Sequence, residues 1–245
     1  MNKKKTYSTD EGMGITSVRL DPDTAQLIAI FTHELKNPIT CLYYLVHHLL
    51  NMGSRDKEGL EIYPILRRQV DHLVYLVDTM TDCSWLDCGE LSLKTELVEI
   101  NDLIKQALEM TRPVMDERHH QVEMVNSPDP IYLSADPNRL LQVLANLLQN
   151  AAKYTPPAGK IHIRVDQRLN TLAISIKDNG IGMDGELLPR VFDLFTRSDE
   201  ACSLCRGAGI GLALASRLVG AHSGTIEAHS NGKGHGSEFI VCLPC

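Results

Sequence analysis

Apolar residues recur at intervals of three or four from Thr24 onward, which is the pattern of an amphipathic helix. The positions are Ile28, Phe31, Leu35, Leu42, Leu45 and Leu49, with Pro38 at the remaining position of the stripe. The stripe stops before Gly53, and glycine commonly ends helices. A second stripe follows a short polar segment, at Leu66, Val70, Leu73, Val77 and Met80. This pattern predicts a two-helix hairpin, and because one hairpin buries its stripes poorly, we expect two copies to form a four-helix bundle.

A mixed α/β pattern begins after Cys88-Gly89-Glu90. Residues 96–100 predict a strand, and the next helix is expected to be capped by Asn101 and kinked or shortened by Pro113. Asp136-Pro137 marks the start of a strongly amphipathic helix. Alternation over 161–165 and 172–176 predicts two strands, followed by a helix from about 209 and strands near 224–229 and 237–243.

These elements predict an α/β sandwich with helices on one face of a sheet. We therefore expect three parts in the chain: an N-terminal tail over residues 1–22, the helical hairpin over 23–90, and the α/β domain over 91–245. The fold class is thus a helical hairpin followed by an α/β domain.

Composition narrows the class of protein. Of 245 residues, 43% are hydrophobic and 22% charged, which is typical of a soluble globular protein. The formal net charge of −7 argues against a general nucleic-acid-binding surface. Because we find neither a membrane span of roughly 18 apolar residues nor the apolar core of a signal peptide, we expect a cytoplasmic protein.

The seven cysteines are an odd number in a chain without a secretory signal, which argues against a disulfide framework. Cys202 with Cys205, and Cys242 with Cys245, have metal or redox spacing, but a zinc site needs a second pair of ligands. Free thiols are the favoured interpretation, and a metal or redox role is the alternative.

Two helical segments carry residues suited to chemistry. FTHELKNP, residues 31–38, places His33, Glu34 and Asn37 in an apolar helix, where a surface histidine beside a surface glutamate is the alternative interpretation. Asn146, Asn150 and Lys153 lie on one helix face. An amide oxygen can bind Mg²⁺ and a lysine can contact phosphates, although a polar helix face is also common.

Three glycine-rich segments follow. Asp178-Asn-Gly-Ile-Gly-Met183 ends a predicted strand; its glycines allow close approach to a flat ligand, and its aspartate could accept a hydrogen bond from an exocyclic amine. A simple turn is the alternative. Residues 206–214 form a glycine loop opening a helix, which favours phosphate, but it matches neither a P-loop nor a Rossmann motif. Gly232-Lys-Gly-His-Gly-Ser237 could be only a hairpin turn.

Taken in order, these segments resemble the motifs of two-component sensor histidine kinases from about residue 24 onward. FTHELKNP resembles the H box, NLLQNAAKYT the N box, DNGIGM the first glycine box, VFDLF the F box, GAGIGLAL the second glycine box and GHGS the third. Six motifs in family order behind a helical hairpin make the resemblance specific.

The chain departs from the family pattern in three places. Leu194 stands where many relatives have proline in the F box. Cys202 and Cys205 fall in the variable lid segment, to which the family lends no role. No sensory domain precedes the hairpin, so we expect either that a separate sensor protein supplies the input or that the chain is the catalytic part of a longer protein.

The resemblance implies a role for each matching residue. His33 would be the phosphoacceptor, and Glu34 the base that draws off its ring proton. The nucleotide site would include Asn146, Asn150 as the Mg²⁺ ligand, Lys153, Tyr154, Asp178 as the adenine acceptor, Gly180, Gly182 and Leu212. Arg197 and the segment to Cys205 would form a lid over ATP. Gly207, Gly209 and Gly211 would act as the hinge of this lid and would bind the phosphates.

Asn37 lies one helical turn beyond His33, where the family resemblance implies a residue that supports removal of phosphate from the regulator; a helix-surface amide is the alternative. Because His33 lies two residues past Phe31, we expect it to face away from the helix seam. Pro38 is expected to weaken the helix there, and a bend could transmit input.

The resemblance therefore implies a homodimeric, Mg²⁺- and ATP-dependent protein histidine kinase that phosphorylates His33 and passes the phosphoryl group to an aspartate on a response-regulator receiver domain. Phosphorylation within or across the dimer remains open. One alternative is a Bergerat-type ATPase or serine kinase, which needs no phosphoacceptor histidine on a hairpin. The other is a pseudokinase scaffold, which would be expected to lack a motif residue, and none is missing.

Overall fold

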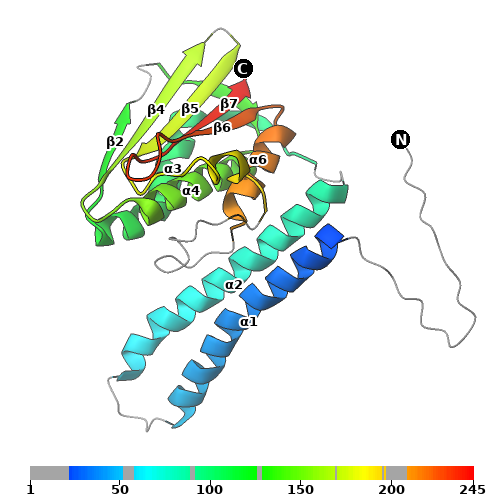
Figure 1. Ribbon diagram of the computed structural model, residues 1–245, viewed down its shortest axis with the longest axis vertical. Coiled ribbons are helices and arrows are strands. Elements are labelled where there is room, and N and C mark those ends of the chain that lie inside the picture. Colours follow the sequence, from blue (N-terminus) through cyan, green and yellow to red (C-terminus); the bar gives the residue numbers. More distant parts are fainter. Residues whose placement is uncertain are drawn as a thin grey trace, which may run out of the picture. The chain divides into compact units, whose positions relative to one another are not determined.

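The computed structural model describes residues 22–51, 58–88, 92–125, 129–168, 170–194, 196 and 209–245 (Figure 1). The chain divides into two compact units, Met1–Val70 and Asp71–Cys245, so the division falls inside a helix. No helix in the described ranges combines the length and the apolar character needed to cross a membrane.

The first unit contains helix α1, Pro22–Asn51, and the beginning of helix α2, Glu58–Cys88. The predicted stripe of α1 is confirmed where side chains are described: Phe31 is 1% exposed and Pro38 is buried. Helix α1 continues through Pro38 to Asn51. A second apolar row remains exposed on this helix, with Ile39 and Tyr43 exposed to 53% and 66%.

The predicted stripe of α2 is partly exposed in the single chain, as expected of a hairpin that buries its stripes poorly. Val70 and Val77 are about half exposed, at 47% and 52%, whereas Ile62 and Leu76 are buried, at 8% and 1%. The reason is that α2 carries two adjacent apolar rows, one through Ile62 and Leu76 and the other through Val70 and Val77. Both rows have helical spacing, so periodicity alone could not tell the buried row from the exposed one.

The described part of the second unit contains the rest of α2, two sheets and the helices α3, α4 and α6. Strands β1 (Glu96–Glu99) and β3 (Tyr132–Ala135) form a small antiparallel sheet. The larger sheet has the order β2-β4-β5-β7-β6, with bounds Gln121–Val125, Lys160–Arg168, Thr171–Asp178, Glu238–Pro244 and Thr225–His229. The helices are α3 (Ile100–Glu117), α4 (Pro137–Tyr154) and α6 (Gly211–Ala221), and a short 3₁₀ turn, η1, covers Leu188–Arg190.

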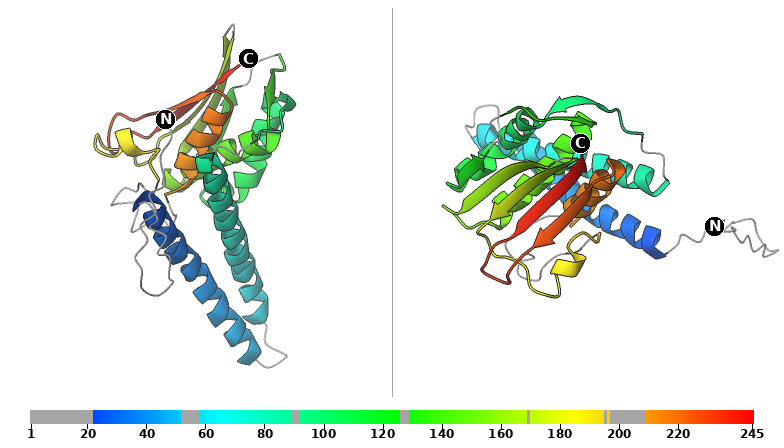
Figure 2. Two further views of the ribbon diagram at one scale, coloured as in Figure 1. Left: turned by 90° about the vertical axis from the view of Figure 1, so that its right-hand side faces the viewer. Right: turned by 90° about the horizontal axis from the view of Figure 1, so that it is seen from above.

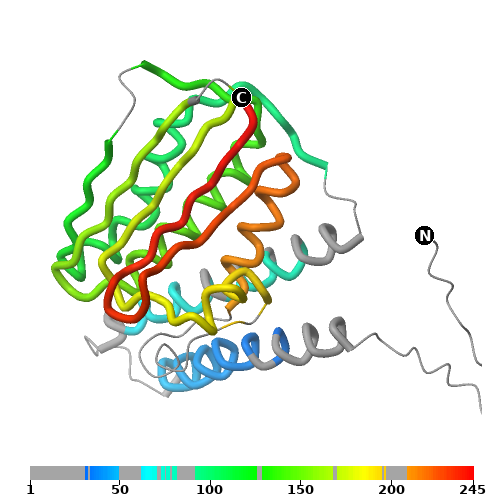
Figure 3. The backbone as a smooth tube through the Cα atoms, turned by 45° about the horizontal axis from the view of Figure 1, so that its top comes forward, coloured from blue at the N-terminus to red at the C-terminus, as the bar shows by residue number. Residues whose placement is uncertain are grey.

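The helices cover one face of the larger sheet, as the sequence predicted (Figure 2). Figure 3 shows its strands side by side; β2 runs parallel to β4 and every other neighbouring pair is antiparallel. Alternate residues such as Ile163, Ile174 and Val241 are fully buried in the core, while His162 and Arg164 face the solvent. This alternation is what a sheet with one covered face requires.

The sequence predicted the N-terminal caps of two helices, α4 and α3. Asp136 caps α4 as predicted, accepting hydrogen bonds from the backbone N–H groups of Asn138 and Arg139 at 3.1 and 3.2 Å. The expected cap of α3 by Asn101 is wrong. Glu99 is the cap, because the chain stays extended through β1 and its carboxylate reaches the N–H groups of Asn101 and Asp102 at 3.1 and 2.8 Å.

Pro113 does not shorten α3, which continues to Glu117. The proline removes one backbone donor, but its own side chain is exposed. Buried residues on both sides of it, including Ala107, Thr111 and Met115, keep the helix packed against the core. Packing therefore outweighs the missing hydrogen bond.

Candidate nucleotide-binding site

The C-terminal half of α4 carries four of the predicted site residues. Asn146 is 5% exposed, and its amide Nδ2 donates to the carbonyl of Gly211 at 3.3 Å, which links α4 to the start of α6. Asn150, Lys153 and Tyr154 are half-buried. The ammonium of Lys153 lies 4.8 Å from the centre of the Tyr154 ring, a cation–π contact.

Asp178 ends β5 and is 5% exposed. Its Oδ1 accepts hydrogen bonds from the N–H groups of Gly180 at 2.7 Å and Ser237 at 3.3 Å. Among the described residues, no donor reaches its other oxygen, Oδ2. Burial raises the pKa of Asp178 above the ordinary 3.8, and the two N–H donors oppose this shift without cancelling it. The described residues therefore leave one oxygen of this carboxylate without a hydrogen-bond donor.

Gly180 and Gly182 allow the loop after β5 to contact two other segments. A Cβ atom on Gly180 would lie 2.4 Å from the carbonyl oxygen of Tyr154, and the N–H of Ile181 donates to that same oxygen at 3.1 Å. Gly182 has a φ of +68°, and a Cβ there would lie 2.2 Å from the carbonyl oxygen of Gly232. Any side chain at either position would displace the loop.

The segment Ser230–Ser237 is more than a hairpin turn, because it packs directly on the loop after β5. The N–H of Gly234 donates to the carbonyl of Ile181 at 2.7 Å, and the N–H of Gly236 to that of Gly180 at 3.1 Å. Ser230 Oγ accepts from the N–H of Met183 at 3.0 Å. Ser230 and Ser237 were not among the predicted site residues. The GHGS motif includes Ser237, whereas Ser230 lies outside every motif.

Helix α6 begins at Gly211, preceded by Gly209 with a φ of +69°. Its N-cap residue, Ile210, makes no side-chain hydrogen bond to the first turn. A helix start of this kind can offer backbone N–H groups to a phosphate, which is the role that the resemblance implies for the second glycine box. Leu212 lies in the same turn and is half-buried.

The F-box segment is anchored to the sheet. Val191 is 8% exposed, and the ring of Phe192 meets that of Phe239 on β7 edge to face, with 6.3 Å between their centres. Leu194 is half-buried. The predicted residues Arg197 and Gly207, the lid cysteines Cys202 and Cys205, and the side chain of His33 lie outside the described residues.

On α1, Glu34 is half-buried and Asn37 is exposed. The described residues contain no group of three or more histidine, cysteine or acidic side chains that could hold a metal ion. Magnesium is usually held by few protein ligands together with water and substrate phosphates, so a site based on Asn150 and a nucleotide fits this arrangement. Cys242 and Cys245 are free thiols, the favoured interpretation.

Residues 135–245 match the family model described as histidine kinase-, DNA gyrase B-, and HSP90-like ATPase. The chain is 31% identical over 224 residues to the circadian input-output histidine kinase CikA of Thermosynechococcus vestitus. The aligned region covers 89% of this chain and 30% of CikA. The chain thus spans about a third of the length of that relative.

Two solved structures share the fold. Full-length ShkA in complex with AMPPNP has a TM-score of 0.67 and 28% identity, covering 89% of this chain and 45% of ShkA. The histidine kinase ThkA in complex with the response regulator TrrA has a TM-score of 0.62 and 22% identity, covering 89% of this chain and 61% of ThkA.

The class of the second unit follows from these similarities: residues 135–245 form an ATPase domain of the histidine kinase, gyrase and HSP90 type. Together with the helical segment before it, the chain has the catalytic core of a sensor histidine kinase, as its motifs predicted.

Proposed function

We propose that this protein is an ATP-dependent protein histidine kinase that transfers the γ-phosphoryl group of ATP to His33. The observation that carries the proposal is the environment of Asp178. Two N–H groups bind one oxygen of this buried carboxylate, and none of the described donors binds the other. The carboxylate lies beside Gly180, Gly182 and Gly236, where an added Cβ atom would clash with backbone atoms.

In the proposed complex, Asp178 Oδ2 accepts a hydrogen bond from the exocyclic amine of adenine, and Tyr154 contacts the nucleotide. Lys153, Arg197 and the N–H groups near Gly207, Gly209 and Gly211 bind the phosphates. Asn150 holds Mg²⁺, which supplies charge neutralisation for the transferring phosphoryl group. Asn146 keeps the start of α6 against α4.

At the phosphoacceptor, a ring nitrogen of His33 attacks the γ-phosphorus. An N–P bond forms, the bond from phosphorus to the bridging oxygen breaks, and ADP leaves. Glu34, adjacent in α1, accepts the proton from the ring. The phosphoryl group then passes to an aspartate on the receiver domain of a response regulator, the class of partner seen with ThkA. We place these reactions in the cytoplasm.

We infer a homodimer from the exposed apolar rows of the two helices. Ile39, Tyr43, Val70, Val74 and Val77 are each exposed by 47% or more. Rows of this kind on long helices are normally buried in a helical bundle. Sedimentation of the chain at micromolar concentration should give a dimer, and a stable monomer would contradict this inference.

The test of the kinase proposal is incubation with γ-labelled ATP. We expect label that is lost in acid and retained in base, as for phosphohistidine. His33→Gln should lose all label yet keep its affinity for ATP, whereas His48→Gln, at an exposed histidine of the same helix, should label normally. Label that persists in His33→Gln would contradict the proposal and favour a serine kinase; ATP binding without any label in the wild type would favour a scaffold.

We also propose that Asn37 supports dephosphorylation of the regulator by holding a water against the phosphoryl group. It is exposed on α1, one turn from His33. Asn37→Ala should phosphorylate itself normally but remove phosphate from its regulator much more slowly. If both activities fall together, Asn37 is structural.

A further inference from the structure

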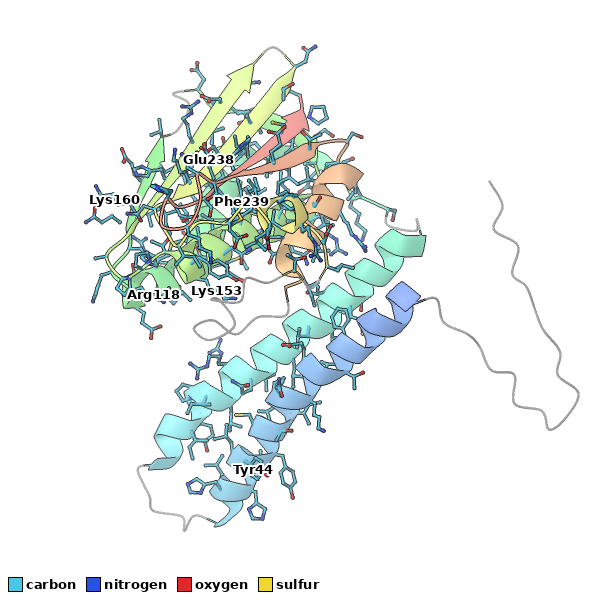
Figure 4. All side chains as sticks on the ribbon, viewed as in Figure 1. Tyr44, Arg118, Lys153, Lys160, Glu238 and Phe239 are labelled. Carbon is cyan, nitrogen blue, oxygen red and sulfur yellow. The ribbon has the colours of Figure 1, made fainter. Side chains whose placement is uncertain are left out.

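Arg118, the residue that ends α3, reaches across to the end of α4. Its guanidinium nitrogen Nη1 lies 2.9, 2.7 and 3.1 Å from the carbonyl oxygens of Ala152, Lys153 and Thr155. These residues belong to the turn that carries Lys153 and Tyr154. Figure 4 shows Arg118 and Lys153 at the same end of the second unit.

The hydrogen bonds at this helix end form a complete set. An α-helix leaves its last four carbonyl groups without partners inside the helix. In α4, the carbonyl of Ala151 accepts from the N–H of Thr155 at 3.0 Å, and that of Tyr154 accepts from the N–H of Ile181 at 3.1 Å. Arg118 binds the two between them. The cation also lies at the negative end of the helix dipole, which is favourable.

The turn that carries Arg118 is itself held in place. The carbonyl of Arg118 accepts from the N–H of Ala158 at 2.8 Å, and the N–H of Gln121 donates to the carbonyl of Gly159 at 2.8 Å. His120 Nε2 lies 3.3 Å from the carbonyl of Thr155. Arg118 is therefore fixed on both sides rather than a mobile surface side chain.

Helix α6 shows that a helix end in this domain can be closed locally. The neighbouring residue His222 donates its backbone N–H to the carbonyls of Leu218 and Val219, and its ring nitrogen Nδ1 lies 2.8 Å from the carbonyl of Leu218. The end of α4 is instead closed by a residue more than thirty positions earlier in the chain and by the loop after Asp178.

We propose that Arg118 is a positioning residue of the nucleotide site. It holds the last turn of α4 so that Lys153 and Tyr154 face the ligand. The same turn places the carbonyl of Tyr154 where it accepts the hydrogen bond from the loop after Asp178. The inference rests on the proposed function, because the affinity for nucleotide is what this arrangement serves.

The experiment measures the affinity for Mg·ATP by calorimetry on the whole chain, below the unfolding temperature of every variant. We expect Arg118→Ala to bind about tenfold more weakly, since two helix-end carbonyls lose a charged donor. Arg118→Lys, which keeps the charge and three N–H donors, should recover part of the loss. Arg112→Ala is the matched control on the same helix, because Arg112 forms only an exposed ion pair with Asp116 at 3.8 Å; it should bind like the wild type.

A second measurement separates positioning from a general loss of stability. If Arg118 acts in part by positioning Lys153, its effect should be smaller in a Lys153→Ala background than in the wild type, because residues acting through one another are not additive. In autophosphorylation, the KM for ATP should rise in Arg118→Ala while the rate at saturating ATP stays within about twofold, since Arg118 does not act on His33.

Three outcomes would each overturn the inference. In the first, Arg118→Ala binds ATP like the wild type, and in the second, Arg118→Lys recovers none of the lost affinity. In the third, Arg118→Ala lowers the ATP affinity as much in the Lys153→Ala background as in the wild type. These outcomes differ from failure of the proposed function, in which the wild type would bind ATP without label on His33, or would bind no ATP at all. Circular dichroism of each variant confirms that the comparison is between folded proteins.

Discussion

Asp136 and Asp178 are two buried aspartates of the ATPase domain with different hydrogen-bond environments. Asp136, before α4, is 7% exposed and accepts hydrogen bonds from three backbone N–H groups, those of Lys94, Asn138 and Arg139. Burial alone would raise the pKa of Asp136, but these donors outweigh it, so the pKa lies below the ordinary 3.8. Folding favours the ionised form of this residue.

Asp178 is buried to a similar extent, at 5% exposed, but its environment has the opposite result. Two N–H groups bind one oxygen, and burial keeps its pKa above the ordinary value. The folded protein therefore holds this carboxylate in a state that costs it stability. The difference teaches that similar burial can serve either a structural carboxylate or one that is kept ready for a ligand.

Asp178→Asn should give the largest change in function. With Oδ1 still held by the two N–H groups, the Nδ2 amide stands where Oδ2 was, and because it is a donor it cannot accept from the adenine amine. We therefore expect an ATP affinity lower by about 10- to 100-fold, or roughly 1.5–3 kcal/mol. Its Oδ1 can still accept from Gly180 and Ser237, and no charge is buried, so the free energy of unfolding should not fall. Denaturant titration and calorimetry check both parts; unchanged affinity would mean that adenine binds elsewhere.

Asp136→Ala should show the reverse behaviour. Loss of the helix cap should lower the free energy of unfolding by about 1–2 kcal/mol, while ATP affinity in the folded protein stays the same. Asp136→Asn is the matched control, because asparagine caps helices almost as well. A large loss of ATP affinity in Asp136→Ala would break the distinction between the two residues.

The two carboxylates should also respond to pH in opposite directions. Below its ordinary pKa, Asp136 loses its stabilising contribution as pH falls through its lowered native pKa. Asp178 contributes most below 3.8 and loses that contribution as pH rises through its raised pKa. Since only ionised Asp178 accepts the amine, ATP affinity should weaken severalfold toward acid pH. Calorimetry across pH should show this in the wild type, while Asp178→Asn should show only the titration of ATP itself.

We expect substitution of Glu238 to have the smallest effect on stability. It tests whether a carboxylate with a lowered pKa always stabilises the fold substantially. Glu238 accepts from Ser175 Oγ at 2.7 Å and pairs with Lys177 at 3.6 Å; these contacts hold the pKa of Glu238 below the ordinary 4.5. Its partner Lys177 is 60% exposed, so solvent screens the pair. Glu238→Gln should cost about 0.5 kcal/mol of unfolding free energy and leave ATP binding unchanged. A loss as large as that of Asp136→Ala would contradict this.

The local sequence pattern was enough to predict most helices and strands and to locate the glycine loops. The N-cap at Asp136, the helix to Tyr154 and the alternation of β4 and β5 follow from interactions between residues close in the chain, as capping and side-chain periodicity do. The resemblance to histidine kinases rested on residues at short, ordered spacings. The errors, the cap at Asn101 and the shortening of α3 at Pro113, lie where two local preferences competed.

Tertiary structure alone decided which residues meet across long separations. The sheet order β2-β4-β5-β7-β6, the packing of Gly232–Ser237 on the loop after Asp178, and the reach of Arg118 to the end of α4 all join segments far apart in sequence. The pKa of Asp178 is decided in the same way, because it depends on burial by several elements and on a donor at Ser237. Such properties arise from packing and dielectric environment, which no short window of sequence contains.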